Sequence, residues 1–196
     1  MDDDQEFVLL CCRGEVEAFE HLVRKYEKKM FNIVYRIVSD YDDTCEIVQD
    51  SFLSAYRAIR TFKGESKFST WLTAITMNHA RNRLKQVKSK REVVFIEDSS
   101  AHSVSSGSMQ HFSLSAGISA MERLEQEEIR QKVQECIGTI ETDQREVLVL
   151  RDIEDFSYDE IRLLLKIPDG TVKSRLSRAR NTLKECLRMK KVIGDL

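Results

Sequence analysis

The sequence predicts an all-α protein built from two small helical domains. Apolar residues recur every three to four positions over long stretches, which is the spacing of helices that bury one face. Helix breakers are rare, with seven glycines and one proline among 196 residues. The periodicity stops in one serine-rich stretch near the middle of the chain. Together these observations argue against a β-rich fold and indicate two helical regions joined by a linker.

The N-terminal domain is expected to span residues 1–92 and to begin with a short acidic helix, about Asp3 to Cys12. A longer helix should follow from about Val16 to Ser39, because an apolar stripe runs along it. That stripe contains Phe19, Leu22, Val23, Tyr26, Met30, Ile33, Val34 and Ile37. It is interpreted as core.

A third helix should start at a cap formed by Asp43 and Glu46 and run to about Ile59. Its apolar side carries Ile47, Val48, Phe52, Ala55, Tyr56 and Ile59. Its polar side carries Glu46, Gln49, Asp50 and Ser54. A polar face of this kind is either ordinary solvent contact or a docking surface for a partner protein.

The segment from Ser66 to Lys85, which follows a turn at Lys63, mixes aromatic and polar residues. Helical spacing places Trp71, Ile75, Asn78 and Asn82 on one stripe. Asparagine amides can pair with base edges, and Phe62, Phe68 and Trp71 could stack on unpaired bases. Phe68 and Trp71 alone are more typical of a core. The basic run that follows favours nucleic acid, because no acidic residue interrupts Arg81, Arg83, Lys85, Lys88, Lys90 and Arg91.

A flexible linker is expected at residues 93–120, where nine serines and two glycines fall between Glu97 and Ser119. The C-terminal domain should then span residues 121–196. Its first helix shows the apolar positions Leu124, Ile129, Val133, Cys136, Ile137 and Ile140. A cap at Asp143 and Glu146 should start the next helix.

The stretch from Phe156 to Leu183 predicts a helix-turn-helix. Ser157 and Glu160 form a capping box at the start of its first helix, whose buried face holds Ile161, Leu164 and Leu165. Pro168, with Asp169 and Gly170, marks the start of the second helix. On that helix Val172, Leu176, Ala179 and Leu183 form one buried stripe.

The opposite arc of this second helix is polar and basic. It carries Thr171, Ser174, Ser177, Arg178 and Asn181, with Lys173, Arg175 and Arg180 on its flanks. Between Lys166 and Lys191 there are nine basic and two acidic residues. A recognition helix of this composition fits a major groove, where its early residues meet base edges and its flanking cations meet phosphates.

Overall composition limits the other possibilities. The formal net charge of −2 argues against a nonspecific polycation, and the positive charge is concentrated in the basic runs described above. The five cysteines (Cys11, Cys12, Cys45, Cys136 and Cys186) form no C-x-x-C pair and are interpreted as reduced thiols. The histidines do not cluster with them, so no metal site and no cofactor are predicted. Without a signal peptide or an apolar run of about 20 residues, a cytoplasmic protein that does not insert into membranes is expected.

Outside the serine-rich segment, nearly the whole chain resembles the extracytoplasmic-function sigma factors of bacterial RNA polymerase. The N-terminal half is similar to sigma domain 2 through GEVEAFEHLVRKY, DDTCEIVQDSFLSAYRAI and FKGESKFSTWLTAITMNHARNRL. The C-terminal half is similar to sigma domain 4, which carries a helix-turn-helix, through REVLVLRDIEDFSYDEI and IPDGTVKSRLSRAR.

The resemblance implies a factor without enzymatic activity that binds core RNA polymerase and promoter DNA and is usually controlled by an anti-sigma factor. The helix from Asp43 to Ile59 would dock on the polymerase through Glu46, Gln49, Asp50 and Ser54. The loop from Arg60 to Ser69 would read and open the minus-10 element, with DNA contacts from Lys63, Phe68, Trp71, Asn78, Asn82 and Arg83. The minus-35 element would be faced by Thr171, Lys173, Ser174, Arg175, Ser177 and Arg178.

Two other classes of function remain open. A stand-alone helix-turn-helix regulator would usually dimerise, and it would leave the segment from Trp71 to Asn82 unexplained. A nucleic-acid enzyme would need a metal or an acid–base cluster. The carboxylates of this sequence instead fall at helix caps and on solvated faces.

Overall fold

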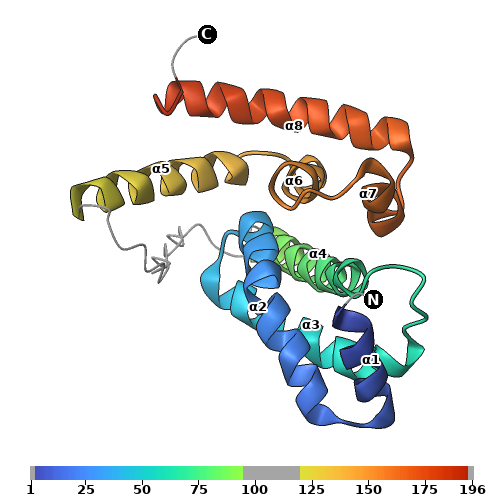
Figure 1. The fold of residues 1–196 in the computed structure, drawn as a ribbon. Coiled ribbons are helices and arrows are strands. Elements are labelled where there is room, and N and C mark those ends of the chain that lie inside the picture. The colour runs from blue at the N-terminus through green and yellow to red at the C-terminus, as the bar shows by residue number, and fades with distance from the viewer. Residues whose placement is uncertain (1–2, 95–119, 194–196) are drawn as a thin grey trace. The chain divides into compact units, whose positions relative to one another are not determined.

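The computed structural model describes residues 3–94 and 120–193, and all regular secondary structure within these ranges is helical. The chain divides into two compact units, one on each side of residues 95–119. Unit 1 contains helices α1 to α4 and unit 2 contains α5 to α8 (Figure 1). The all-α class and the two-domain organisation are confirmed. The linker predicted at 93–120 lies almost entirely outside the described residues, and the domain limits at 92 and 121 stay predictions.

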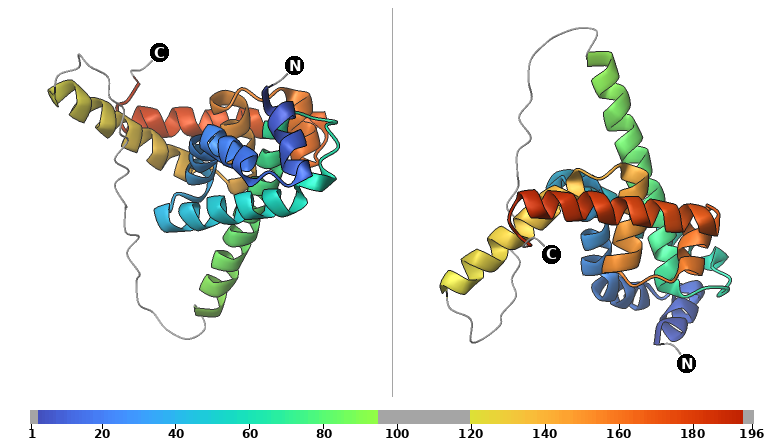
Figure 2. Two further views of the ribbon diagram at one scale, coloured as in Figure 1. Left: turned by 60° about the horizontal axis from the view of Figure 1, so that its bottom comes forward. Right: turned by 90° about the horizontal axis from the view of Figure 1, so that it is seen from above.

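Unit 1 is a bundle of α1 (Asp3–Arg13), α2 (Val16–Val38), α3 (Tyr41–Ala58) and α4 (Phe68–Val94), with a 3-10 turn, η1 (Ile59–Thr61), after α3. The stripe predicted for α2 is buried except for Val23, which is half-buried. It packs against apolar residues of α3 and α4 such as Ile47, Leu72 and Ala80, each at most 4% exposed. The last turns of α4 project beyond the other helices of the unit (Figure 2).

Unit 2 contains α5 (Ala120–Gly138), α6 (Thr142–Leu148), α7 (Tyr158–Leu165) and α8 (Asp169–Met189). The end of α6 widens into a π-helical turn, η2 (Val149–Ile153). The core is formed where α6 and α7 meet α8, and it contains Val147, Leu148, Leu150, Phe156, Ile161, Val172, Leu176 and Ala179. The predicted helix-turn-helix therefore exists as α7 and α8 and rests on α6.

One of the three predicted helix caps is present. At α7 the Ser157 hydroxyl accepts from the backbone N–H of Glu160, and the Glu160 carboxylate accepts from that of Ser157. The cap predicted at Asp43 and Glu46 is wrong, because α3 starts one turn earlier and Asp40 accepts from the Asp43 N–H at 2.8 Å. Several acidic residues fall in this turn, and spacing alone could not select the one that is extended.

The cap predicted at Asp143 and Glu146 is also wrong. The residue that precedes α6 is Glu141, and its side chain makes no capping hydrogen bond. Glu146 is instead buried at 3% exposure. Asp143 reaches α8 and pairs with Arg175, as described below.

Two predictions for the first helix of unit 2 are corrected. Leu124 and Ile129 are exposed, at 69% and 49%, because α5 packs only through its C-terminal third. The interpretation of all five cysteines as reduced thiols is wrong for two of them, since Cys136 and Cys186 form a disulfide. They are 50 residues apart in sequence, so spacing gave no sign that the ends of α5 and α8 meet.

Candidate nucleic-acid interfaces

The helix-turn-helix in unit 2 is fixed by its turn and by its buried stripe. α7 ends at Leu165 and is followed by Lys166, which adopts a left-handed conformation with φ of 56°. Pro168 then precedes α8, where its fixed φ suits the last residue before a helix and its missing N–H costs nothing. Val172, Leu176 and Ala179 are at most 2% exposed, whereas Leu183 is half-buried. These contacts determine which side of α8 faces outward.

The outward side of α8 presents most of the predicted DNA-binding residues of this unit. Lys173, Ser174, Ser177 and Arg178 are exposed, and Thr171 and Arg175 are half-buried. The Ser174 hydroxyl donates to the Thr171 carbonyl at 3.1 Å. The remaining side chains of this arc point away from the core and offer hydroxyl and cationic donors, the groups that read base edges and phosphates.

On the outward arc of α8 and its flanks, Lys173, Arg175 and Arg180 are paired with carboxylates. Lys173 meets Asp169 one turn earlier on α8 at 2.7 Å, and this hydrogen bond raises the pKa of Lys173. Arg175 meets Asp143 of α6 at 2.9 Å. These pairs restrain the side chains without blocking the outward arc, because both cations keep part of their surface in solvent.

The third pair is bidentate. Arg180 donates through Nε and Nη2 to the two carboxylate oxygens of Asp152 in η2, at 2.8 and 2.6 Å, which raises the pKa of Arg180. Arg178 makes no ion pair with any residue of the described ranges. Arg178 is therefore the cation of the outward arc whose charge is most available to a ligand.

In unit 1 an aromatic cluster supports the loop between η1 and α4. Phe68 is 2% exposed and packs against Tyr26, Phe62 and Trp71, with ring centroids 5.7, 6.0 and 5.7 Å apart. Phe62 and Trp71 are half-buried and lie 5.1 Å apart. Because Phe68 has no free ring face, it positions the two outer rings and does not itself offer a stacking surface.

A pocket of about 310 Å³ opens beside this cluster, between α1 and the loop. Its wall includes Asp4, Gln5, Val8, Phe62, Gly64, Glu65, Ser66, Lys67 and Phe68. Asp4 is 4% exposed and accepts from Lys25 at 2.6 Å and from the Tyr26 hydroxyl. Sequence reasoning selected Lys63 in this loop and missed Lys67, which lines the pocket. It also missed α1, whose distance in sequence from the loop gave no signal.

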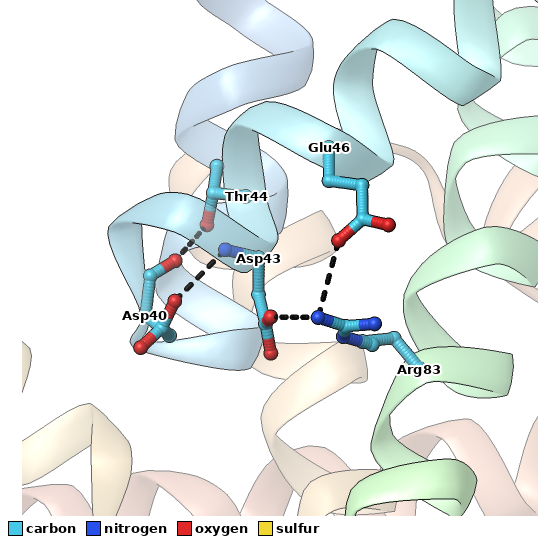
Figure 3. A network of polar contacts seen from close by, with 5 residues as sticks. All are labelled: Asp40, Asp43, Thr44, Glu46 and Arg83. Atoms are coloured by element: carbon cyan, nitrogen blue, oxygen red, sulfur yellow. Dashed lines mark hydrogen bonds and ion pairs between the residues drawn. The ribbon is translucent and has the colours of Figure 1, made fainter.

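The polar stripe of α4 is exposed where it was expected to be. Asn78 and Asn82 are exposed and Trp71 is half-buried. Arg83 lies differently, since its guanidinium donates to Asp43 and lies 3.1 Å from Glu46 (Figure 3). The hydrogen bond to Asp43 raises the pKa of Arg83. Arg83 thus joins α4 to α3, and its predicted contact with DNA would compete with this pairing.

The polar side of α3 forms a separate surface. Glu46, Gln49 and Asp50 are exposed, whereas Ser54 is half-buried and hydrogen-bonded to the His79 ring at 3.0 Å. Leu53 and Tyr56 are exposed beside Gln49 on this helix, at 46% and 40%. Because its carboxylates would repel phosphates and its exposed apolar side chains can be buried by a partner, this surface suits protein docking more than contact with DNA.

Family models match both units of the chain. The model described as "Sigma-70 region 2" matches residues 22–90, and the model described as "Sigma-70, region 4" matches residues 130–183. The chain is also 33% identical to the RNA polymerase sigma-H factor of Pseudomonas aeruginosa over 187 residues, which cover 95% of this chain and 94% of the relative. It is 35% identical to the ECF RNA polymerase sigma-E factor of Escherichia coli K12 over 92% of each chain.

The chain belongs to the extracytoplasmic-function sigma factors. It is an RNA polymerase sigma factor that directs promoter recognition and transcription initiation, and it is not an enzyme. Unit 1 corresponds to sigma region 2 and unit 2 to sigma region 4.

Solved structures share the fold of this sigma factor. The sigma factor RpoE of Bartonella quintana, solved with the anti-sigma factor NepR, matches with a TM-score of 0.66 and 26% identity over 87% of this chain and 96% of that one. CnrH, solved with the cytosolic domain of CnrY, matches with a TM-score of 0.64 and 23% identity over 95% and 97%. Among the described residues of the sigma factor, no helix is long and apolar enough to cross a membrane.

Proposed function

We propose that this sigma factor divides promoter recognition between its two units. The outward arc of α8 reads the minus-35 duplex, the loop and α4 of unit 1 capture the opened minus-10 strand, and the polar face of α3 docks on core RNA polymerase. The observation that carries this assignment is the outward arc of α8, which presents Arg178 without an ion pair to any described residue, on a helix held from behind by the buried side chains of Val172, Leu176 and Ala179.

At the minus-35 element, α8 acts as a rigid reading helix. Ser174, Ser177 and Arg178 would meet base edges, and Thr171, Lys173 and Arg175 would hold the flanking phosphates. A cation already paired with a carboxylate gains less from a phosphate, since it must share its donors. Arg178 should therefore contribute more than Lys173 or Arg175.

At the minus-10 element, unit 1 acts on single-stranded bases. Phe62 and Trp71 present half-buried rings at the mouth of the loop, and Asn78 and Asn82 continue the line as exposed amides. Lys63 and Lys67 bring positive charge to the loop. Capturing bases as they unstack would offset a melting cost of a few kcal/mol per step.

We also propose a cytoplasmic location and two protein partners. Core polymerase would use Glu46, Gln49, Asp50 and Ser54 of α3. An anti-sigma factor would cover this face and one of the DNA-binding faces, a proposal supported by the similarity to a sigma factor whose structure contains an anti-sigma factor. Affinity purification from the native cell should recover polymerase under inducing conditions and the inhibitor at rest. Recovery of polymerase alone in both conditions would contradict the inhibitor.

Run-off transcription tests the whole assignment. When the purified chain is mixed with core RNA polymerase and genomic DNA, transcription should start at promoters from which core polymerase alone does not initiate. The matched comparison is Arg178→Ala against Arg130→Ala, because Arg130 is an exposed arginine on α5 of the same unit, away from the arc. Equal transcription from both variants would reject α8 as the reading helix.

A further inference from the structure

The disulfide between Cys136 and Cys186 lies on the side of α8 that faces away from the proposed DNA surface. Their Cα atoms are 5.6 Å apart, a separation typical of bridged cysteines. Cys136 is fully buried and Cys186 is 6% exposed. Cys186 continues the buried stripe of Val172, Leu176 and Ala179. Forming or breaking this bridge therefore acts on the buried side of α8.

The bridge lies at the point where α5 is attached to the rest of unit 2. Noncovalent attachment comes from the C-terminal third of α5, where Ile137 is buried and Glu135 pairs with Lys190 near the end of α8. Residues 121–131 are all exposed. With so little buried surface, α5 depends on the bridge for its position more than the other helices of the unit do.

We propose that Cys136 and Cys186 are a reversible thiol–disulfide switch that fastens α5 to α8 when oxidised and releases it when reduced. The inference rests on the proposed cytoplasmic location, because bridges in that compartment are usually transient or redox-sensing. The other three cysteines, Cys11, Cys12 and Cys45, are free thiols of unit 1. Cys136 and Cys186 both belong to unit 2, so the proposed switch lies within a single unit.

A low-molecular-weight disulfide such as oxidised glutathione is the oxidant that the chemistry requires. One cysteine thiolate attacks a sulfur of that disulfide, and one small thiolate leaves while a mixed disulfide forms on the protein. The thiolate of the second cysteine then attacks the protein sulfur of the mixed disulfide, and the second small thiolate leaves. Two protein thiols are oxidised, one small disulfide is reduced to two thiols, and the two protons pass to these products or to solvent.

Reduction follows the same steps in reverse and should begin at Cys186, since it is the more exposed of the two residues. The oxidised chain should then contain three alkylatable cysteines and the reduced chain five. Mass spectrometry after alkylation, on the full-length native chain in mixtures of reduced and oxidised glutathione, should show both states and full interconversion. A bridge that resists reduced glutathione in the native chain, or one that never forms with oxidised glutathione, overturns the switch.

The fastening of α5 has its own readout. Hydrogen exchange of the full-length chain should slow about tenfold or more on oxidation in peptides from α5 and from the C-terminal end of α8. The unfolding temperature of unit 2 should rise by roughly 10 °C or more, as expected for a bridge that closes a long loop. Peptides from residues 3–94 should exchange equally in both states. Interconversion without these changes overturns the claim that the bridge fastens α5.

Two variants separate the bridge from other effects of oxidation. The double variant C136S/C186S should lose all response to glutathione, whereas C45S should respond like the unmodified chain because Cys45 is an exposed free thiol of unit 1. If the serines at the buried positions prevent folding, the reduced unmodified chain supplies the unbridged state. A response that persists in the folded double variant assigns it to another cysteine and overturns the proposal.

Discussion

At the scale of single residues, charge pairing separates the cations of α8 into two groups. Lys173, Arg175 and Arg180 each have a carboxylate within 3 Å, whereas Arg178 has none in the described ranges. Exposed pairs are worth little for stability, so the effect of these pairs is on binding. A paired cation exchanges one anion for another when it meets a phosphate, and an unpaired one gains a new partner.

The first prediction compares Arg178→Ala with Lys173→Ala. Arg178→Ala should weaken binding to a duplex with the upstream element by about 1–3 kcal/mol, because a base contact is lost. Lys173→Ala should lower the salt slope by about one unit and leave sequence preference unchanged. Salt titrations on specific and scrambled duplexes measure both effects, with Arg130→Ala as the control. Unchanged affinity in both variants would refute the placement of α8 on DNA.

The second prediction concerns the three free cysteines. Burial raises the pKa of Cys11 above its usual 9.0, and the neighbouring Cys12 raises it further, so Cys11 holds little thiolate at neutral pH. Cys45 is exposed. Timed alkylation of the native chain at about pH 8, followed by peptide mapping, should label Cys45 first and Cys11 last. Early labelling of Cys11 would show that α1 opens.

At the scale of helices, the third prediction tests the cap of α3. Asp40→Ala should lower the free energy of unfolding of unit 1 by about 1 kcal/mol, because the backbone N–H of Asp43 loses its acceptor. Asp42→Ala is the matched control, since Asp42 is exposed in the same turn and makes no cap. Urea unfolding of both variants decides it, and equal losses would indicate a general charge effect.

The helices themselves were largely predictable from the sequence, and their ends were not. Strong periodicity fixed α2 and α8, where Leu22, Ile33, Val172 and Leu176 fall on the buried side as expected. Periodicity failed for α5, because Leu124 and Ile129 lie before the C-terminal third of the helix, which is the part that packs within unit 2, and they are exposed. The predicted caps of α3 and α6 were wrong because several acidic residues lie near the start of each helix. Only the backbone conformation decides which of them occupies the N-cap position.

The candidate sites, too, could be predicted only where neighbouring residues of one helix form them. The outward arc of α8 could be predicted, because one helix carries all of it and the opposite side is apolar. The pocket beside Phe62 could not, because its wall combines α1 with a loop some sixty residues later. The pairing of Arg83 with Asp43 and the bridge from Cys136 to Cys186 were missed for the same reason. Contacts between distant segments follow from packing and leave no periodic signal.

At the scale of the whole molecule, the proposed function assigns the two units to different steps of transcription initiation. The fourth prediction is that Asn78→Ala impairs promoter opening more than closed-complex formation, whereas Arg178→Ala does the reverse. Asn78 lies on the stripe of α4 proposed to capture the opened strand, and Arg178 lies on α8, the helix proposed to read the duplex. Permanganate footprinting of unpaired thymines and mobility shifts of closed complexes with core polymerase separate the two steps. Equal loss of both complexes in both variants would contradict the division.

The pairing of Arg175 with Asp143 and of Arg180 with Asp152 also bears on the thermodynamics of promoter binding. A long side chain that is free in solution gives up about 1.5–2 kcal/mol of rotamer entropy when it is fixed. The side chains of Arg175 and Arg180 are already held by Asp143 and Asp152, so much of this entropy is lost on folding and not on binding. The arginines that flank the outward arc of α8 should therefore lose little entropy when they contact DNA. Removing Asp152 should make the enthalpy of binding more favourable and its entropy less favourable, while the charge of α8 stays the same.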